Sequence, residues 1–271
     1  MRTAIAIRSI VAVKTASDLF FEQLSGARSR VLLLDYDGTI APFSVQRNRA
    51  FPYPTVPELL DCIMSTCRTR LVLITGRAAR EIPPLLGLDP HPEVWGASGF
   101  ERLCADGRYE VGRLSADVQQ ALCEAEAWLD KEGLHRSTEL KPGAVAVHWR
   151  GLKRSLIEEV RAAAYRVLSP LARRTSLLLA EFDGGLELRA RTCTKGDAVR
   201  TIVSEVSPEV PIAYLGDDIT DEDAFRVLND RGLTVLVRPM YRFTAAQMWL
   251  RPPGELIQFF ADWVRASGGD M

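Results

Sequence analysis

The stretch Val31-Leu32-Leu33-Leu34-Asp35-Tyr36-Asp37-Gly38-Thr39 joins four apolar residues directly to a pair of carboxylates. An unbroken apolar run of this kind predicts a strand buried on both faces, as in a parallel sheet. In open α/β sheets, ligands bind beyond the carboxyl ends of such strands. Asp35 and Asp37 therefore stand where a divalent cation and an oxygen nucleophile could act, and Gly38 allows a tight turn. An ordinary turn after a strand would also favour Asp and Gly, so this stretch alone leaves both interpretations open.

The composition is that of a globular protein. The chain has 271 residues, 47% hydrophobic and 25% charged, which suits one large domain or two modest ones. With 34 basic and 35 acidic residues, its net charge of -1 gives no case for nucleic acid or an anionic membrane as a partner. Five scattered cysteines without a Cys-x-x-Cys pair indicate neither a disulfide framework nor a zinc site. We expect a cytoplasmic protein without a signal peptide or membrane span, in which residues 1 to about 13 form a tail or a first helical turn.

Four more apolar runs predict further strands of the same sheet. They are Leu71–Thr75, Val94–Ala97, Pro211–Leu215 and Leu233–Val237. Helix-like segments lie between several of them, for example Pro57 to Met64, where a proline precedes apolar residues at helical spacing. Strands that alternate with helices predict a parallel sheet with right-handed crossovers. The sequence therefore predicts an α/β core.

The middle of the chain follows another order: helix, two strands, helix, two strands. The expected helices are 115–132 and 152–168, and the expected strands are 135–141, 144–149, 177–180 and 186–190, the last two joined by a turn at 182–185. This order is typical of an α+β unit. We therefore expect an inserted domain at residues 113–190 and a core formed by residues 1–112 and 191–271.

Two further motifs stand at predicted ends of elements. Thr75 ends a strand where a helix is expected to begin, and a hydroxyl followed by free helix amides suits an anion, although Thr75 could equally be a simple helix cap. Lys195 opens the helix that follows the inserted unit. It could neutralise a phosphate and hold the Asp35 carboxylate, whereas a single lysine at a helix start is usually only solvated.

The last motif is the acidic stretch Gly216-Asp217-Asp218-Ile219-Thr220-Asp221-Glu222-Asp223, which directly follows a predicted strand. Its carboxylates repel one another unless a cation lies among them or most of them face solvent. Asp217 and Asp221, four residues apart across a turn, can face a common point. An acidic helix N-terminus, stabilised by the helix dipole, would account for Asp221 to Asp223 but poorly for Asp217 and Asp218.

Together these motifs resemble, in order and in strand context, the four motifs of the haloacid dehalogenase superfamily of phosphohydrolases. Within it, Asp35–Thr39, Thr75-Gly76-Arg77 and Gly216–Phe225 are similar to the trehalose-6-phosphate phosphatases. The inserted unit falls where that family carries a mobile cap, and the resemblance covers about residues 30 to 262. The expected fold class is thus α/β, a Rossmann-like parallel-sheet hydrolase core with an inserted α+β cap domain.

The resemblance implies a phosphatase that uses Mg²⁺ and converts trehalose-6-phosphate to trehalose and phosphate. It implies that Asp35 is the nucleophile, that Asp37 protonates the leaving sugar and then activates water, and that Thr75 and Lys195 complete a cradle for the phosphate. The implied metal ligands are Asp35, Asp37 through its backbone carbonyl, Asp217 and, through water, Asp221. A small-molecule sugar phosphate would be the partner, with functional pairing to a trehalose-6-phosphate synthase.

The inserted unit carries two more stretches that resemble the family. Glu139-Leu140-Lys141 is similar to a Glu-x-Lys element, and Val145-Ala146-Val147-His148-Trp149-Arg150 is similar to a Val-His-Tyr-Arg element. The resemblance implies that the sugar or its phosphate is contacted by Glu139, Lys141, Arg150 and Glu187, whose side chains accept from hydroxyls or donate to hydroxyls and phosphate. Strand residues that merely face water would give a similar pattern. His148 is expected to pack or to hydrogen-bond within the cap.

The chain departs from the family at two positions. Ser98, in Gly96-Ala97-Ser98-Gly99-Phe100-Glu101, replaces a histidine, and Trp149 stands where tyrosine is commoner. Neither position lies in the four catalytic motifs. The first lies near the junction of core and cap and therefore bears on the choice of sugar.

Other functions share these motifs. A sucrose-phosphate or mannosyl-phosphoglycerate phosphatase has the same fold, as has a phosphomannomutase, which would yield an isomerised sugar phosphate instead of free phosphate. A non-catalytic module that senses a sugar phosphate or regulates a synthase would be free to lose Asp35, Asp37 or Asp217. All three are present, which favours an enzyme.

Overall fold

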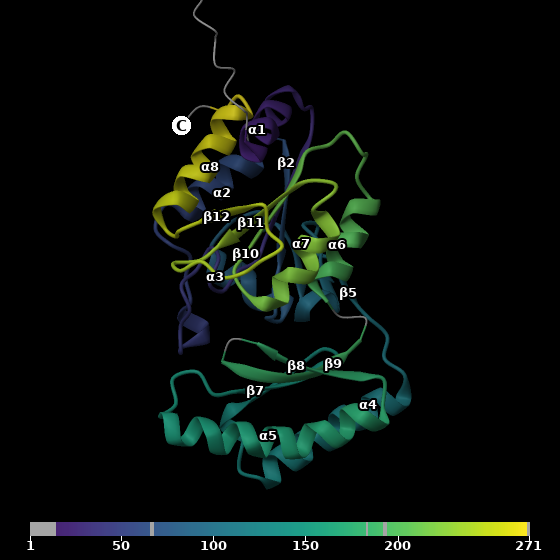
Figure 1. The fold of residues 1–271 in the computed structure, drawn as a ribbon. Coiled ribbons are helices and arrows are strands. Elements are labelled where there is room, and N and C mark those ends of the chain that lie inside the picture. Colours follow the sequence, from purple (N-terminus) through teal and green to yellow (C-terminus); the bar gives the residue numbers. More distant parts are fainter. Residues whose placement is uncertain (1–14, 66–67, 183, 192–193, 270–271) are drawn as a thin grey trace, which may run out of the picture.

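The large sheet places the predicted strands side by side. The computed structural model describes residues 15–65, 68–182, 184–191 and 194–269. Its larger sheet has the order β12-β11-β10-β1-β2-β3-β4-β5 (Figure 1). The strands are β1 (Arg30–Leu34), β2 (Thr69–Ile74), β3 (Glu93–Gly96), β4 (Glu101–Leu103), β5 (Tyr109–Val111), β10 (Ile212–Gly216), β11 (Leu233–Val237) and β12 (Met248–Leu250). All pairs from β12 to β3 are parallel, whereas β4 and β5 extend one edge in antiparallel fashion.

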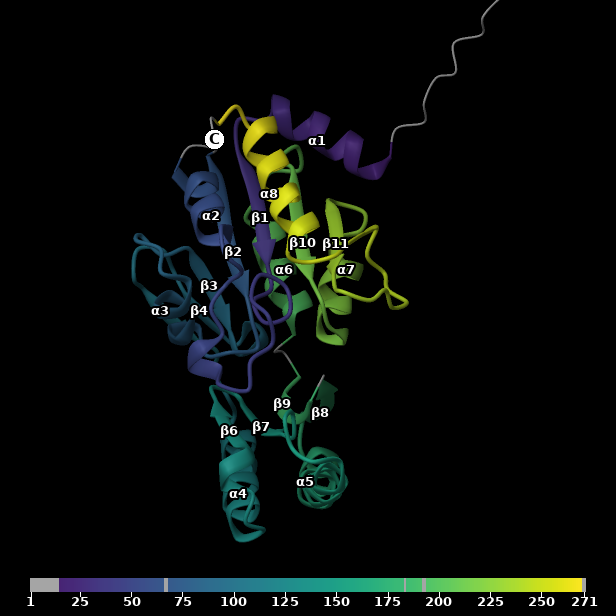
Figure 2. The ribbon, with the colours of Figure 1, turned by 90° about the vertical axis from the view of Figure 1, so that its left-hand side faces the viewer.

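Helices cover both faces of this sheet. One face carries α1 (Ala16–Gly26), α2 (Val56–Ser65), α3 (Ile82–Leu86) and α8 (Gly254–Ala266), and the other carries α6 (Lys195–Ser204) and α7 (Glu222–Leu228) (Figure 2). Strand β1 serves both layers, because Leu32 and Leu34 pack into the first cluster while Val31 and Leu33 pack into the second. The expected strand with two buried faces is confirmed, and so is the α/β core.

The second sheet has a hydrophobic cluster of its own. Its strands β6 (Thr138–Lys141), β7 (Ala144–His148), β9 (Gly185–Ala190) and β8 (Leu177–Phe182) lie in that order and are antiparallel. Helices α4 (Ala116–Lys131) and α5 (Arg154–Arg174) cover the face away from the large sheet (Figure 1). Val145 and Val147 pack among these helices. Because strand side chains alternate, the residues between them face the large sheet.

Three expected elements differ from the structure. The strand expected from residue 135 begins at Thr138, because His135–Ser137 form a turn of 3-10 helix. The helix expected over 152–168 begins at Arg154 and continues through Pro170 to Arg174, since Leu168 and Leu171 remain part of its buried face. No α-helix begins at Thr75; a 3-10 turn at Ala79–Glu81 and then α3 follow instead.

Some expectations concern the thiols, the membrane and the tail. Cys62, Cys104 and Cys123 are free thiols, while Cys67 and Cys193 lie outside the described residues, as does the expected tail at 1–13. Among the helices that the structure describes, none has the length and apolar character that crossing a bilayer requires. The domain limits at residues 113 and 190 stay a prediction.

Candidate active site

The carboxyl ends of three neighbouring strands bring the predicted core residues together. Asp35 follows β1, Thr75 follows β2 and Asp217 follows β10, and these strands are parallel neighbours in the order β10-β1-β2. Lys195 reaches the same edge from the first residue of α6, whose start is fixed by a reciprocal cap between Thr194 and Asp197. All four predicted side chains are buried.

Lys195 links two of the carboxylates. Its Nζ lies 2.7 Å from Oδ1 of Asp35 and 2.8 Å from Oδ1 of Asp221. The other oxygen of Asp35 accepts a hydrogen bond of 3.2 Å from the Thr39 hydroxyl. The predicted contact of Lys195 with the Asp35 carboxylate is therefore present, and Asp35 is held at both oxygens.

Asp221 is fully enclosed and fully bonded. Besides Lys195, the hydroxyl of Tyr214 donates to its Oδ1, and its Oδ2 accepts from the backbone amides of Asp217 at 3.0 Å and Asp218 at 2.9 Å. These bonds fix the turn that follows β10. Asp221 thus orients the acidic stretch as well as adding its charge to the site.

Two glycines make this close packing possible. Gly38 has φ of +85°, and a Cβ there would lie 2.2 Å from Oδ2 of Asp217. A Cβ on Gly216 would lie 2.4 Å from Cγ of Asp221. A side chain at either position would displace a carboxylate of the site, which is a physical reason for glycine in both motifs.

The buried charges are unbalanced. Burial raises the pKa of Asp35 to about 7, although Lys195 opposes the shift, and the Asp221 carboxylate adds to it. Burial also raises the pKa of Asp217 well above its usual range, and the charge of Asp35 raises it further. Burial opposes the charge of Lys195, but Asp221 and Asp35 outweigh it and raise the pKa of the amine. The cluster therefore favours an additional positive charge.

The same residues fit a divalent cation. Oxygens of Asp35, Asp217 and Asp221 lie within 4.8 Å of one another. Oδ1 of Asp217 is buried and accepts no hydrogen bond within the described part of the chain. Carboxylate oxygens are the ligands that Mg²⁺ prefers, and an unpartnered buried oxygen is costly without one.

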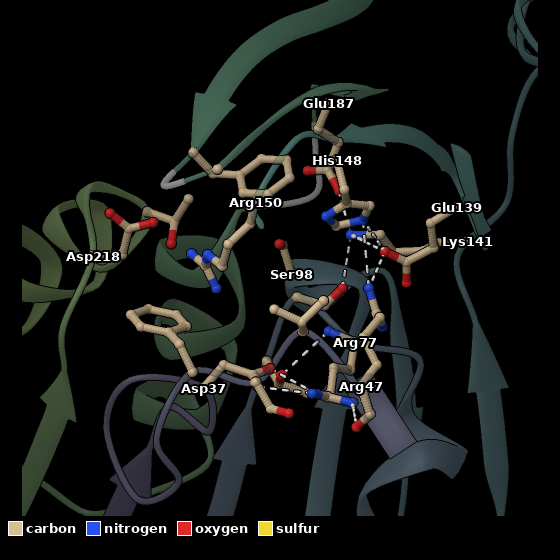
Figure 3. A pocket seen from close by; sticks show the side chains of 18 of the residues that line it. Asp37, Arg47, Arg77, Ser98, Glu139, Lys141, His148, Arg150, Glu187 and Asp218 are labelled. Atoms are coloured by element: carbon tan, nitrogen blue, oxygen red, sulfur yellow. Dashed lines mark hydrogen bonds and ion pairs between the residues drawn. The ribbon is translucent and has the colours of Figure 1, made fainter. Parts of the chain in front are cut away.

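The Asp37 side chain is bound by Arg77, whose role the sequence analysis did not predict. Nε of Arg77 lies 2.6 Å from one oxygen of Asp37, and Nη2 lies 2.8 Å from the other (Figure 3). The Arg77 side chain is only 4% exposed. Its Nη1 also donates to the Arg47 carbonyl at 2.8 Å. Asp37 is therefore oriented by a two-pronged ion pair.

Thr75 does not cap a helix. Its hydroxyl accepts a hydrogen bond of 3.2 Å from the Arg77 amide, which turns the chain directly after β2. Its carbonyl accepts from the amide of Ser98 at 2.9 Å, and Ser98 adopts a left-handed conformation with φ of 57°. Thr75 and Ser98 both line the cavity between the two sheets. Ser98, which replaces the histidine of the family pattern, therefore forms part of the cavity wall.

One cavity of about 560 Å³ joins the two sheets. This volume is within the roughly 300–1,000 Å³ of small-molecule sites. The predicted residues that line it are Asp35, Asp37, Thr75, Glu139, Lys141, Arg150, Glu187, Lys195 and Asp217. Asp221 lies behind this surface and has no exposed area. The structure thus gathers the predicted core and cap residues at one place.

The residues contributed by the second sheet are bonded to each other and to the core. Nζ of Lys141 donates to Glu187 at 2.6 Å and to the Gly76 carbonyl at 2.9 Å. Glu139 accepts from Nε2 of His148 at 2.6 Å, which confirms the expected hydrogen bond within the cap. Burial opposes the ionisation of Glu139, but His148 and the charges of Lys141 and Arg47 outweigh it and lower its pKa to about 2.

Sequence reasoning missed the loop between β1 and α2. Phe43, Val45 and Arg47 line the cavity, and the guanidinium of Arg150 lies 3.8 Å from the Phe43 ring centroid. Only the position of this loop in the sequence, a few residues after the first motif, could have indicated that it reaches the site. Loops that leave the carboxyl end of a strand in such sheets commonly reach the ligand.

Comparisons with known proteins agree with this arrangement. A family model described as trehalose-phosphatase matches residues 136–245. A trehalose-phosphate phosphatase of Mycobacterium bovis is 31% identical over 249 residues, with 86% of this chain and 61% of the relative covered. Trehalose-phosphate phosphatase B of Arabidopsis thaliana is 28% identical, with 96% of this chain and 74% of the relative covered.

Solved structures show the same fold. The C-terminal domain of a trehalose-6-phosphate phosphatase from C. albicans matches with a TM-score of 0.75 at 20% identity, covering 93% of this chain and 96% of that one. A haloacid dehalogenase-like hydrolase from B. subtilis matches with a TM-score of 0.60 at 14% identity, covering 86% and 99%. The chain spans about three fifths of the length of the mycobacterial relatives. Over residues 136–245 it is similar to the trehalose-phosphatase family, and it has the fold of the haloacid dehalogenase-like hydrolases.

Proposed function

We propose that this chain is a Mg²⁺-dependent phosphatase that hydrolyses trehalose-6-phosphate to trehalose and phosphate. One observation carries the proposal: a buried cluster of carboxylates and a lysine faces a polar surface of the second sheet across a single cavity. The first surface suits a phosphate and the second suits sugar hydroxyls. We infer that the sugar is trehalose because the similar proteins are named trehalose-phosphate phosphatases.

In the proposed first step, a carboxylate oxygen of Asp35 attacks the phosphorus atom. A bond forms between that oxygen and phosphorus while the bond from phosphorus to the sugar oxygen breaks, which leaves a phosphorylated Asp35. The sugar oxygen leaves with the bonding electrons and takes up a proton. Lys195 and Thr39, which hold the Asp35 carboxylate, orient it for the attack.

Asp37 is proposed to move the protons. It would donate one to the leaving sugar oxygen and then accept one from the water that cleaves the phosphorylated Asp35. Both of its oxygens now contact Arg77, so one of them has to turn away from the guanidinium to reach a leaving group. Arg77 would then return Asp37 to a fixed position after each transfer.

The proposed metal ligands are Asp35, the Asp37 carbonyl, Asp217 and, through water, Asp221. The buried oxygen of Asp217 that lacks a hydrogen bond supports this set. When bound, Mg²⁺ would offset the negative charge of these carboxylates and of the phosphate oxygens. Thr75 and Lys195 would complete the cradle from the side of the protein.

The second sheet is proposed to act as a cap that selects the sugar. Residues 113–190 would form this cap domain, and residues 1–112 and 191–271 would form the catalytic core. Glu139 and Glu187 would accept from sugar hydroxyls, and Lys141 and Arg150 would donate to hydroxyls or phosphate. A trehalose-6-phosphate synthase would be the functional partner, since its product is the proposed substrate, and both would act in the cytoplasm.

A phosphate-release screen with Mg²⁺ tests the proposal. Trehalose-6-phosphate should give free phosphate at a kcat/KM at least about tenfold above sucrose-6-phosphate and glucose-6-phosphate. EDTA should remove the activity, and added Mg²⁺ should restore it. Preference for another sugar phosphate, or an isomerised sugar phosphate as product, would refute the assignment of the substrate.

A further inference from the structure

We propose that the segment Phe43–Arg47 is a clamp on the core that positions the sugar-binding side chains of the second sheet. The inference rests on the proposed function for the identity of the ligand, but its contacts are independent of it. The clamp makes an ion pair with Glu139 of β6 and an aromatic contact with Arg150, which lies in the turn after β7. None of its residues belongs to the four catalytic motifs.

Arg47 makes the first contact. Its Nη1 donates to Oε2 of Glu139 across the junction between the two sheets, and it lies 3.5 Å from Nε2 of His148 (Figure 3). Glu139 is largely buried, and its charged form therefore depends on the cations around it. A residue of the core thus holds a carboxylate of the second sheet in place.

Arg47 is itself fixed from the core side. Its Nη2 donates to Glu81 at 3.2 Å, and its backbone carbonyl accepts from Arg77 at 2.8 Å. Glu81 also lies 3.4 Å from Arg77, the residue that binds Asp37. The position of Glu139 is therefore connected through three side chains to the carboxylate proposed to move protons.

The free oxygen of Glu139 points to the role of the contact. Arg47 and His148 both bind Oε2, whereas Oε1 is buried and has no hydrogen-bond partner within the described residues. A buried carboxylate oxygen without a partner is costly, and this one belongs to a residue that lines the cavity. Arg47 therefore orients Glu139 so that one oxygen remains available for a ligand hydroxyl.

Phe43 makes the second contact. Phe43 is 40% exposed and lines the cavity, and the Arg150 guanidinium stacks on its ring at 3.8 Å from the ring centroid. Val45 packs beside it against Gly151, where a Cβ would lie only 3.1 Å from a Val45 methyl group. Stacking on an aromatic ring limits the directions in which a guanidinium can point. The clamp thus orients a hydrogen-bond donor as well as an acceptor.

The test compares Arg47→Ala with Arg49→Ala. Arg49 belongs to the same 3-10 turn and is exposed, and among the described residues its side chain bonds only to nearby Gln46, so it is a matched control. We expect Arg47→Ala to raise KM for trehalose-6-phosphate on the order of tenfold, with little change for p-nitrophenyl phosphate, which carries no sugar. Arg47→Lys should restore part of the loss, and Phe43→Ala should raise the same KM by a smaller factor than Arg47→Ala. Equal effects on both substrates, or an Arg47→Ala indistinguishable from Arg49→Ala, would overturn the proposal.

A measurement without substrate separates the clamp from the proposed function. Hydrogen exchange of the β6 and β7 amides should be faster in Arg47→Ala than in Arg49→Ala, because the second sheet loses one of its contacts with the core while Lys141 keeps its bond to the Gly76 carbonyl. If the chain releases no phosphate from trehalose-6-phosphate, the proposed function fails, and this exchange alone decides on the clamp. Equal exchange in the two variants contradicts it.

Discussion

The cavity has two sides, which we call the floor, on the large sheet, and the roof, on the side of the second sheet. They differ in the location of the groups that pair with their charged side chains. The floor, formed by Asp35, Lys195, Asp217 and Asp221, is bonded almost entirely within one edge of the large sheet. The roof consists of Glu139, Lys141 and Glu187 on the second sheet and Arg150 in the turn after β7. It is bonded partly to the core, through Arg47, the Gly76 carbonyl and Phe43.

The floor and the roof therefore differ in how far their charges are satisfied before a ligand binds. The floor is a fixed cluster in which three carboxylates share one lysine, so we expect a cation and a phosphate to complete it with little rearrangement of the protein. The roof already satisfies its charges, partly by contacts within the second sheet and partly by contacts across the junction. A ligand therefore has to share or replace those contacts, and changes in the roof should affect substrate choice more than chemistry.

The largest expected effect is on the floor. Asp35→Asn should lower phosphate release from every phosphate monoester by roughly 10⁴-fold or more, because the neutral amide is a poor nucleophile. Steady-state assays with trehalose-6-phosphate and p-nitrophenyl phosphate measure the loss. Asp223→Asn, an exposed residue of the acidic stretch that pairs with Arg226, serves as the control and should retain activity. Activity of Asp35→Asn near that of the control would exclude the nucleophile.

Loss of the buried amine should be the next largest effect. Lys195→Met leaves Asp35 and Asp221 buried without their shared cation, so the free energy of unfolding should fall by about 3–5 kcal/mol. Urea unfolding in EDTA measures this. Arg200 lies in the same helix and, within the part of the chain that the structure describes, pairs only with Asp197 on the surface. Arg200→Met should therefore change the free energy of unfolding by less than about 1 kcal/mol. If the two variants are equally stable, the buried network does not hold the floor together.

The smallest expected effect is on the stability of the fold at acid pH. The pKa of Glu139 is lowered from 4.5 to about 2, so its ion pairs stabilise the fold fully above pH 4.5 and lose this contribution as the pH falls toward 2. In Arg47→Ala the pKa of Glu139 should rise, because one of the charges that lower it is lost, and the loss of stability should begin at higher pH. Carbon-13 NMR of the Glu139 carboxyl, assigned with Glu139→Gln, follows the titration. An unchanged pKa would show that Arg47 contributes nothing to the charge of Glu139.

The sequence predicts the floor well because its motifs stand at strand ends. Asp35, Thr75 and Asp217 follow apolar runs, and parallel neighbours bring such positions together whatever the loops do. The helix expected to open at Lys195 does begin there, and the structure shows that Thr194 and Asp197 cap it. The antiparallel edge of β4 and β5 was missed because those strands are short and lack a long apolar run.

The contacts of the roof could not be predicted in this way. Arg47 and Glu139 are separated by 92 positions, and no periodicity relates a loop of the core to a strand of the second sheet. The pairing of Arg77 with Asp37 depends on the turn after Thr75, where the sequence favoured a helix. Contacts between long polar side chains depend on tertiary placement, so they become visible only in the structure.

The central claim is that the roof selects the sugar while the floor performs the chemistry. The ratio of kcat/KM for trehalose-6-phosphate to kcat/KM for p-nitrophenyl phosphate tests it most directly. Lys141 is the roof residue that binds both Glu187 and the core carbonyl of Gly76. Lys141→Met should lower kcat/KM for trehalose-6-phosphate on the order of 10- to 100-fold and leave that for p-nitrophenyl phosphate nearly unchanged, so the ratio of the two should fall by the same factor. An unchanged ratio, with both substrates losing activity equally, would contradict a roof that selects the sugar above a floor that performs the chemistry.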